Sequence, residues 1–213
     1  MRDPASQLKL PSLYAIFDPE QTKARATEAV LRALLDAGIE LLQLRVKMMA
    51  PGSFFQLART VRTLTDSYAC KLIVNDRVDI ALACGADGVH LGQEDFPLAA
   101  ARKLMGDRII GISTHNLAQA REAERSGADY IGFGPMFGTT TKNTGYSARG
   151  VEMLRAIRQG VSLPIVAIGG ITEANVTGVW QAGADSAAII SDILAAEDIT
   201  TKTRRIRASR RVL

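Results

Sequence analysis

One pattern recurs along the chain: a helical stretch reaches a glycine, an acidic residue follows closely, and a short apolar run comes next. Glycine after amphipathic periodicity is typical of a helix C-terminus, because it adopts the left-handed backbone conformation at low cost. The apolar runs are too short for helices and too continuous for half-exposed strands, so they predict parallel strands buried on both faces. The copies read AGIELLQLR (37–45), CGADGVHLG (84–92), SGADYIGFG (126–134) and AGADSAAII (182–190).

Over the whole chain, this pattern predicts strands that alternate with helices. The helical periodicity is clearest over 26–37, 53–67, 117–126 and 151–159. With no low-complexity linker, the alternation predicts an α/β fold, a single-domain (β/α)8 TIM barrel over residues 1–213. The pattern alone does not separate this barrel from an open doubly wound sheet. The expected strands are near 13–18, 41–45, 72–76, 88–92, 108–113, 130–135, 164–170 and 186–191.

Composition narrows the class of protein. A chain of 213 residues with 47% hydrophobic content can bury the core of one domain. No apolar run approaches the roughly 18 residues of a membrane span, and the polar N-terminus lacks the apolar stretch of a secretory signal. Cys70 and Cys84 have neither zinc-site nor disulfide-framework spacing. We therefore expect a cytoplasmic protein with reduced thiols and no membrane partner.

The C-terminus carries a basic tail, about residues 202–213, which supplies much of the net charge of +4. A solvated helix end or a frayed tail is favoured over a nucleic-acid-binding arm, and few aromatic residues are present to stack bases. We expect no nucleic-acid partner, and removal of 202–213 should leave turnover unchanged if the last helix stays packed. The sequence leaves open whether copies of the chain form a homo-oligomer.

Polar residues gather where the predicted strands end. In a TIM barrel the active site lies at the C-terminal ends of the strands. Polar groups after almost every strand therefore predict a functional site on this rim. They are Gln43, Arg45, Lys47, Asn75, Asp76, Gln93, Asp95, Ser113, His115, Thr139, Thr141, Lys142, Gly169, Gly170 and Ser191.

Asp76 and Asp95 end neighbouring strands, whose backbones lie about 4.8 Å apart. Two carboxylates that close repel each other unless a cation or a shared proton lies between them. A hard cation with few protein ligands is typical of Mg²⁺ on a phosphorylated substrate. Basic residues that could flank a diphosphate, and neutral donors, stand nearby: Arg45, Lys47, Lys142, Asn75 and Ser113. The pair thus predicts a metal–diphosphate site, and general acid–base catalysis is the alternative.

A second phosphate site is predicted after the last two strands, at AIGGI (167–171) and AIIS (188–191). Loops at this position of a barrel often hold a phosphate on backbone N–H groups, because glycine permits close approach. The glycine pair alone could be a tight turn, but Ser191 on the adjacent strand favours the phosphate. Two phosphorylated ligands are therefore expected on one rim.

Other catalytic motifs are absent. The glycines of IGFGPMFG lack dinucleotide-binding spacing, and the chain has no Walker sequence, HExxH or GxSxG. The only histidines are His90 and His115. His90 is either a packed core residue or a ligand contact. His115 is explained as a residue at the entry of a helix.

Several motifs together resemble thiamine-phosphate synthase, over Leu13 to Ala196 and in the family's order. The resemblance implies a (β/α)8 enzyme that joins a hydroxymethylpyrimidine diphosphate to a hydroxyethylthiazole phosphate, with Mg²⁺ as cofactor. Diphosphate would leave before the thiazole nitrogen attacks, so no enzymic nucleophile is needed. The motifs are QLRVK (43–47), VNDRVDIAL (74–82), DGVHLGQED (87–95), GIS (111–113), GADYIGFGPMF (127–137), TTTK (139–142) and AIGGI (167–171).

The resemblance also implies roles for individual residues. Asp76 and Asp95 would bind Mg²⁺, and Arg45, Lys142 and Ser113 would act in catalysis. The pyrimidine diphosphate would contact Gln43, Leu44, Arg45, Val46, Lys47, Asn75, Ser113 and Lys142. The thiazole phosphate would contact Thr139, Thr140, Thr141, Gly170, Ile190 and Ser191. The loop 138–149 departs from the family pattern, since it lacks the usual acidic residue after Lys142 and the usual proline before it.

Two rivals predict other activities. A thiazole tautomerase uses the same barrel but typically has a histidine where Pro135 stands, and lacks the paired acids. A binding module without catalysis would use the phosphate sites or the basic tail alone. Asp76, Asp95 and Pro135 favour the synthase.

Overall fold

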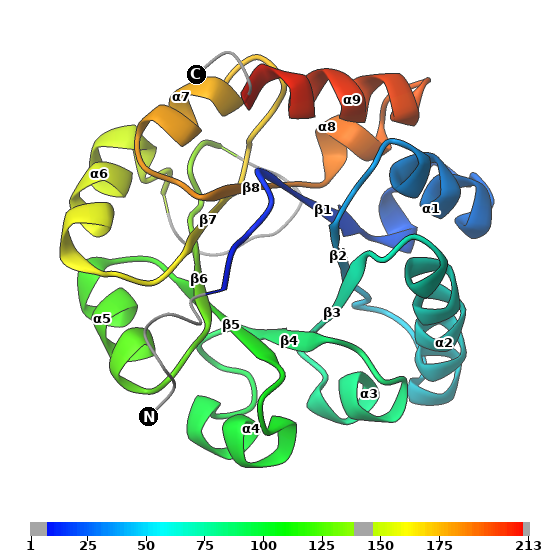
Figure 1. Cartoon of the computed structure of the whole chain (residues 1–213), viewed down its shortest axis with the longest axis horizontal. Coiled ribbons are helices and arrows are strands. Elements are labelled where there is room, and N and C mark those ends of the chain that lie inside the picture. The colour runs from blue at the N-terminus through cyan, green and yellow to red at the C-terminus, as the bar shows by residue number, and fades with distance from the viewer. Residues whose placement is uncertain (1–7, 139–146, 211–213) are drawn as a thin grey trace.

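Parallel strands close into a barrel in the computed structural model, which describes residues 8–138 and 147–210 (Figure 1). Each strand pairs with the next, and β8 pairs with β1, so the sheet has no open edge. The closed order confirms the predicted (β/α)8 barrel and excludes the open sheet. The strands are β1 (Leu13–Phe17), β2 (Leu41–Leu44), β3 (Lys71–Asn75), β4 (Gly88–Leu91), β5 (Ile109–Thr114), β6 (Tyr130–Phe133), β7 (Ile165–Ile168) and β8 (Ser186–Ile189).

Helices form the outer ring of the barrel and alternate with the strands (Figure 1). The four predicted helices are present as α1, α2, α5 and α6, with ends within a few residues of those expected. The helices are α1 (Thr27–Asp36), α2 (Pro51–Ser67), α3 (Val78–Ala83), α4 (Leu98–Met105), α5 (Leu117–Arg125), α6 (Gly150–Gly160), α7 (Val176–Gln181), α8 (Ser191–Leu194) and α9 (Ile199–Ser209), with the 3-10 turn η2 (Pro19–Gln21) after β1.

The strands are buried on both faces, as predicted, and they separate two cores. In β1, Leu13 and Phe17 face the helices, whereas Tyr14 and Ile16 face the barrel interior. The outer core is almost wholly aliphatic and aromatic, and most of the apolar burial that stabilises the fold lies there. The interior also holds polar side chains, which lead up to the C-terminal rim.

The acidic residue of the recurring pattern is structural in three of its copies. It precedes an even-numbered strand and accepts a hydrogen bond from a backbone N–H near the start of the strand before it. An arginine from the helix that precedes the earlier of the two strands also binds each carboxylate: Arg62 of α2, Arg102 of α4 and Arg158 of α6. These carboxylates therefore join strands at the N-terminal end of the barrel. The backbone bonds are Leu72 N to Asp87 Oδ2 (2.8 Å), Ile110 N to Asp129 Oδ2 (2.7 Å) and Ile165 N to Asp185 Oδ2 (2.8 Å).

The first part of the basic tail is a packed helix rather than a frayed end. Helix α9 lies against α1 and α8, with Thr203 and Ile206 fully buried (Figure 1). Lys202 bridges Glu173 and Asp192 at 3.0 Å each. The basic residues thus help to attach the last helix to the barrel. Among the described residues, no helix is long and apolar enough to cross a membrane.

Candidate active site

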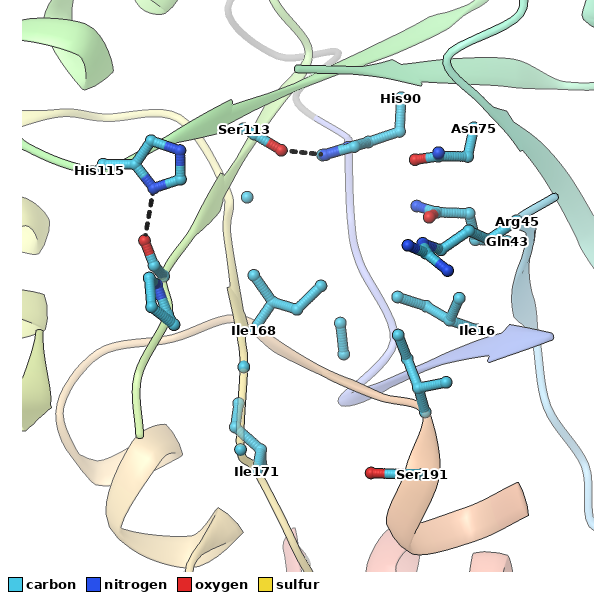
Figure 2. A pocket seen from close by; sticks show the side chains of 17 residues that line it. Ile16, Gln43, Arg45, Asn75, His90, Ser113, His115, Ile168, Ile171 and Ser191 are labelled. Carbon is cyan, nitrogen blue, oxygen red and sulfur yellow. Dashed lines mark hydrogen bonds between the residues drawn. The ribbon is translucent and has the colours of Figure 1, made fainter. Parts of the chain in front are cut away.

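A pocket opens at the C-terminal end of the barrel and receives residues from every strand or the loop after it (Figure 2). In Figure 2, Gln43, Arg45 and Asn75 lie along one side, and Ser191 lies at the other end from Asn75. The structure thus brings residues of both predicted phosphate sites into one cavity. Those that line it are Gln43, Arg45, Asn75, Ser113, Gly170, Ile190 and Ser191.

Arg45 is held by a buried carboxylate. Its Nη1 donates to Oδ2 of Asp18, which directly follows β1 and is fully buried. The other oxygen of Asp18 accepts the backbone N–H of Glu20 at 3.0 Å, so the carboxylate is itself fixed. Sequence analysis missed Asp18, although it directly follows its strand as Asp76 does. A guanidinium held this way can present its remaining N–H groups to a phosphate.

Asp76 and Asp95 lie side by side on the rim. Burial and the neighbouring carboxylate of Asp76 raise the pKa of Asp95 above its usual value. Asp76 has a φ of 63°, and its backbone N–H donates to the carbonyl of His90 at 2.8 Å. Lys47 Nζ donates to Asp76, and the N–H of Gly92 donates to Asp95 Oδ2 at 2.6 Å. The predicted neighbours are therefore in contact, with a lysine beside them.

Other residues predicted for the pyrimidine diphosphate differ in orientation. The carbonyl of Ser113 accepts from Gln93 Nε2 at 2.6 Å, which holds the end of β5 in place. Leu44 is fully buried and faces the outer core, and Val46 packs against the same core. A ligand could reach Leu44 only through its backbone atoms.

The loops after β7 and β8 border the other side of the pocket. Gly169 and Gly170 have φ of 98° and 66°, and a Cβ on Gly170 would lie 2.5 Å from the carbonyl oxygen of Gly138. Asn175 Nδ2 donates to the carbonyl of Gly170 at 3.0 Å, which fixes the loop. Ser191 begins α8 and also lines the pocket. The predicted residues Thr139, Thr140, Thr141 and Lys142 lie outside the described residues.

A line of hydrogen bonds crosses the barrel interior below the pocket. Gln43 Nε2 donates to Tyr14 Oη at 3.1 Å, and the Tyr14 and Tyr130 hydroxyls lie 3.1 Å apart. Tyr130 Oη lies 3.0 Å from His90 Nδ1, and His90 Nε2 lies 2.9 Å from Ser113 Oγ. His90, which the sequence left open, is therefore both a buried, hydrogen-bonded residue and part of the pocket lining. Sequence analysis missed Tyr14 and Tyr130.

His115 and Pro135 stand together on the rim. His115 Nδ1 lies 2.6 Å from the carbonyl oxygen of Gly134, and the backbone N–H of His115 donates to Gln119 Oε1 at 2.7 Å. Both His115 and Pro135 line the pocket, with the proline at the position where the tautomerase typically has histidine. His115 therefore belongs to the pocket lining as well as standing at the entry of α5.

Comparison with known proteins agrees with this geometry. The family model described as thiamine monophosphate synthase matches residues 13–193. The thiamine-phosphate synthase of Chloroflexus aurantiacus is 47% identical over 92% of this chain and 91% of its own length. That of Moorella thermoacetica is 44% identical over 92% of this chain and 93% of its own length.

A solved structure is similar over nearly the whole fold. Thiamine phosphate pyrophosphorylase from Pyrococcus furiosus superposes with a TM-score of 0.87 at 38% identity, covering 95% of this chain and 96% of that one. 3-Hexulose-6-phosphate synthase, at 17% identity and a TM-score of 0.67, shares the fold alone. On the family match and these identities, the chain belongs to the thiamine monophosphate synthase family of transferases.

Proposed function

We propose that this chain is a Mg²⁺-dependent thiamine-phosphate synthase. It would condense 4-amino-2-methyl-5-hydroxymethylpyrimidine diphosphate with 4-methyl-5-(2-phosphooxyethyl)thiazole to give thiamine monophosphate and pyrophosphate. The activity rests on the family and on relatives named for it. The observation that carries the metal is the contact between Asp76 and Asp95 on the rim of the barrel, with Lys47 bonded to Asp76.

The carboxylate pair fits a divalent cation. Two carboxylates in contact, one with a raised pKa, are relieved when a cation binds between them. The described residues contain no cluster of three or more His, Cys, Asp or Glu side chains that could hold a metal. Asp76 and Asp95 would therefore be the protein ligands, with substrate phosphate and water as the others. When bound, Mg²⁺ would neutralise charge on the departing diphosphate.

The basic side chains on the same side would bind the diphosphate. Arg45, fixed by Asp18, would act as a fork, and Lys47 would exchange its contact with Asp76 for a phosphate oxygen. Asn75 and Ser113 would add neutral donors from the pocket wall. Lys142, which lies between β6 and α6 in the sequence and outside the described residues, is proposed as a further cation on the diphosphate.

The thiazole phosphate would bind across the pocket. Gly170, held by Asn175, leaves backbone groups accessible, and Ser191 adds a hydroxyl. Ile190 lines the same wall and would contact the thiazole ring. Residues Thr139–Thr141 are proposed to complete the phosphate site. This arrangement would hold the thiazole nitrogen opposite the pyrimidine methylene, which is the main requirement of a two-substrate condensation.

The chemistry needs positioning and charge stabilisation rather than a nucleophile. The methylene C–O bond breaks, and the electron pair leaves with the diphosphate. The aminopyrimidine ring stabilises the cation that remains, and the thiazole nitrogen lone pair forms the new C–N bond. No proton is transferred overall, so the lack of a catalytic triad in the sequence is expected. Apolar side chains that line the pocket, such as Ile16 and Ile168, would limit attack by water.

The direct test is an assay with both substrates, in Mg²⁺ and after chelation. Formation of thiamine monophosphate and pyrophosphate in equal amounts, lost on chelation and restored by Mg²⁺, supports the proposal. Aromatisation of a thiazole carboxylate without condensation would favour the tautomerase. The buried free thiols of Cys70 and Cys84 are compatible with the cytoplasmic location that we propose for the enzyme.

A further inference from the structure

The hydrogen-bonded line from Gln43 to Ser113 joins two pocket residues through groups that no ligand needs to touch. Tyr14 and Tyr130 are buried in the barrel interior, with ring centroids 6.1 Å apart, and His90 stacks on Tyr130 at 5.5 Å. Gln43 and Ser113, at the two ends, line the pocket. Such a line can transmit the orientation of one end to the other.

Glycines make room for this line. A Cβ on Gly111 of β5 would lie 2.0 Å from Cζ of Tyr130, and one on Gly132 of β6 would lie 2.9 Å from Cε1 of His90. The phenol and the imidazole therefore occupy space that side chains of neighbouring strands would otherwise fill. The two rings thus take their place beside the aliphatic side chains of the interior because Gly111 and Gly132 carry no Cβ.

The number of protons that each group carries decides which group donates in each hydrogen bond of the line. Burial raises the pKa of Tyr14 and of Tyr130, so each keeps one O–H proton at neutral pH. Tyr14 accepts from the amide of Gln43, so its own proton goes to Tyr130. Tyr130 then donates to His90 Nδ1. A neutral His90 therefore carries its proton on Nε2 and donates it to Ser113 Oγ.

The opposite direction conflicts with the amide of Gln43. If Tyr130 donated to Tyr14, the Tyr14 oxygen would accept two bonds and its proton would lack an acceptor among the described residues. A buried O–H without an acceptor is costly. The opposite direction becomes possible only if the Gln43 amide turns over and presents its oxygen to Tyr14, and every bond up to Ser113 then reverses. The line thus has two mutually exclusive directions.

The direction of these hydrogen bonds decides whether Gln43 and Ser113 present a donor or an acceptor to a ligand in the pocket. With Nε2 of Gln43 bound to Tyr14, the amide presents its carbonyl oxygen, an acceptor. Ser113 accepts from His90, so its own O–H proton remains to be donated. We propose that Tyr14, Tyr130 and His90 are positioning residues that make Gln43 an acceptor and Ser113 a donor, and so select an aminopyrimidine over an oxopyrimidine. This proposal rests on the proposed synthase function.

The selection follows from the edge of the ring. A 4-aminopyrimidine presents an N–H donor on its amino group and an acceptor on the adjacent ring nitrogen. The 4-oxo analogue presents a carbonyl acceptor and a ring N–H donor at the same two positions. Opposite the carbonyl oxygen of Gln43, the carbonyl of the analogue meets a second acceptor. The ring N–H of the analogue cannot accept the proton that Ser113 donates, so a site built this way rejects the analogue strongly.

The first experiment reads the tautomer directly. Long-range ¹H–¹⁵N spectra of the full chain at neutral pH contain signals from only two histidines, His90 and His115. A His115→Gln variant assigns them. We expect neutral His90 with its proton on Nε2. A proton on Nδ1 would show that the line runs the other way and would overturn the proposal, whatever the enzyme's activity.

The second experiment measures selectivity. Tyr130→Phe removes one oxygen and breaks the line, and we expect the ratio of kcat/KM for the aminopyrimidine diphosphate to that for its 4-oxo analogue to fall on the order of tenfold or more. Tyr68→Phe is the matched control, because Tyr68 is partly exposed and bonds to Asp36 away from the pocket. That variant should keep the parent ratio.

Tyr14→Phe provides a second break in the line should Tyr130→Phe fail to fold. An unchanged ratio in a folded variant, with only a lower kcat, would reduce the tyrosines to a structural role and overturn the proposal. An inactive parent chain would instead refute the proposed synthase function, and the tautomer of His90 would still be measurable. The two failures are therefore distinguishable.

Discussion

The carboxylates of Asp76 and Asp95 are in contact on the rim of the barrel, and burial, together with this contact, raises the pKa of Asp95. Asp76 also adopts a left-handed conformation, with φ of 63°, which non-glycine residues seldom use. Like charges and an uncommon backbone conformation at one place are typical of a site kept for function rather than for stability.

Replacing Asp76 with Asn should remove one charge and keep the side-chain shape. If both acids hold Mg²⁺ against the diphosphate, turnover should fall by on the order of a hundredfold, as when an electrostatic partner of the transition state is lost. Titration calorimetry should show weaker binding of Mg²⁺–pyrimidine diphosphate and nearly normal binding of thiazole phosphate. Parent-like binding of the Mg²⁺ complex would mean that these acids are only turn residues.

Ser191→Ala should have the complementary effect. Ser191 lies with Gly170 on the wall proposed for the thiazole phosphate. Losing its hydroxyl should raise the KM for thiazole phosphate about tenfold, the usual effect of one hydrogen bond to a charged group. Affinity for Mg²⁺–pyrimidine diphosphate should stay at the parent value. Equal losses for both substrates would argue against separate sites.

Asp18→Ala should leave Arg45 without its buried partner. Removing one member of a buried ion pair typically costs about 3–5 kcal/mol of stability, and Asp18 is fully buried. Denaturant unfolding measures this cost, and the KM for the diphosphate should rise in the folded fraction. The control is Asp79→Ala, which breaks a more exposed pair with Arg77 and should cost only about 0–1 kcal/mol. Equal losses of unfolding free energy in the two variants would show that the Asp18–Arg45 pair contributes no more to stability than an exposed ion pair.

Ile206→Ala should destabilise the whole chain. Ile206 is fully buried in α9, and such truncations typically cost about 2–5 kcal/mol. Removing residues 202–213 should therefore lower the melting temperature markedly, since it also deletes buried Thr203 and the bridge from Lys202. Unchanged turnover after this truncation is expected only if the last helix stays packed, and removing residues 202–213 deletes most of that helix. A truncated chain with parent-like stability would contradict this.

Asp198→Ala should destabilise the start of α9 in a pH-dependent way. The backbone N–H and side-chain hydroxyl of Thr201 donate to Asp198 and lower its pKa. Because the pKa of Asp198 is lower in the folded chain than in the unfolded chain, its ionised carboxylate stabilises the folded state at pH values above the unfolded pKa, near 3.9. This contribution is lost as the pH falls through the folded pKa. The gap in melting temperature between parent and variant should thus be widest at neutral pH and narrow in acid. A gap that does not change with pH would contradict this.

The sequence by itself determined the alternation of strands with helices and the place of the site, and the structure showed that the sheet closes into a barrel. Four glycine–acid–apolar units, together with the apolar runs between the other helical stretches, predict eight buried parallel strands. Polar residues after almost every strand point to one rim. These are local signals: periodicity, helix ends and strand ends are encoded by residues close together in the chain. The motifs that resemble the family added the reaction, and the match over residues 13–193 confirms that family.

Tertiary structure decided which side chains meet. Two sets of hydrogen bonds join residues of different strands and the loops after them. One is the bond from Arg45 to Asp18, and the other is the line from Gln43 through Tyr14, Tyr130 and His90 to Ser113. Tyr14 and Tyr130 have the periodicity of ordinary core residues. Only closure of the barrel brings their hydroxyls together, and Gly111, which pairs with Tyr130, leaves room for the Tyr130 ring. Pairing of buried polar groups depends on the three-dimensional fit of several strands, which no short stretch of sequence encodes.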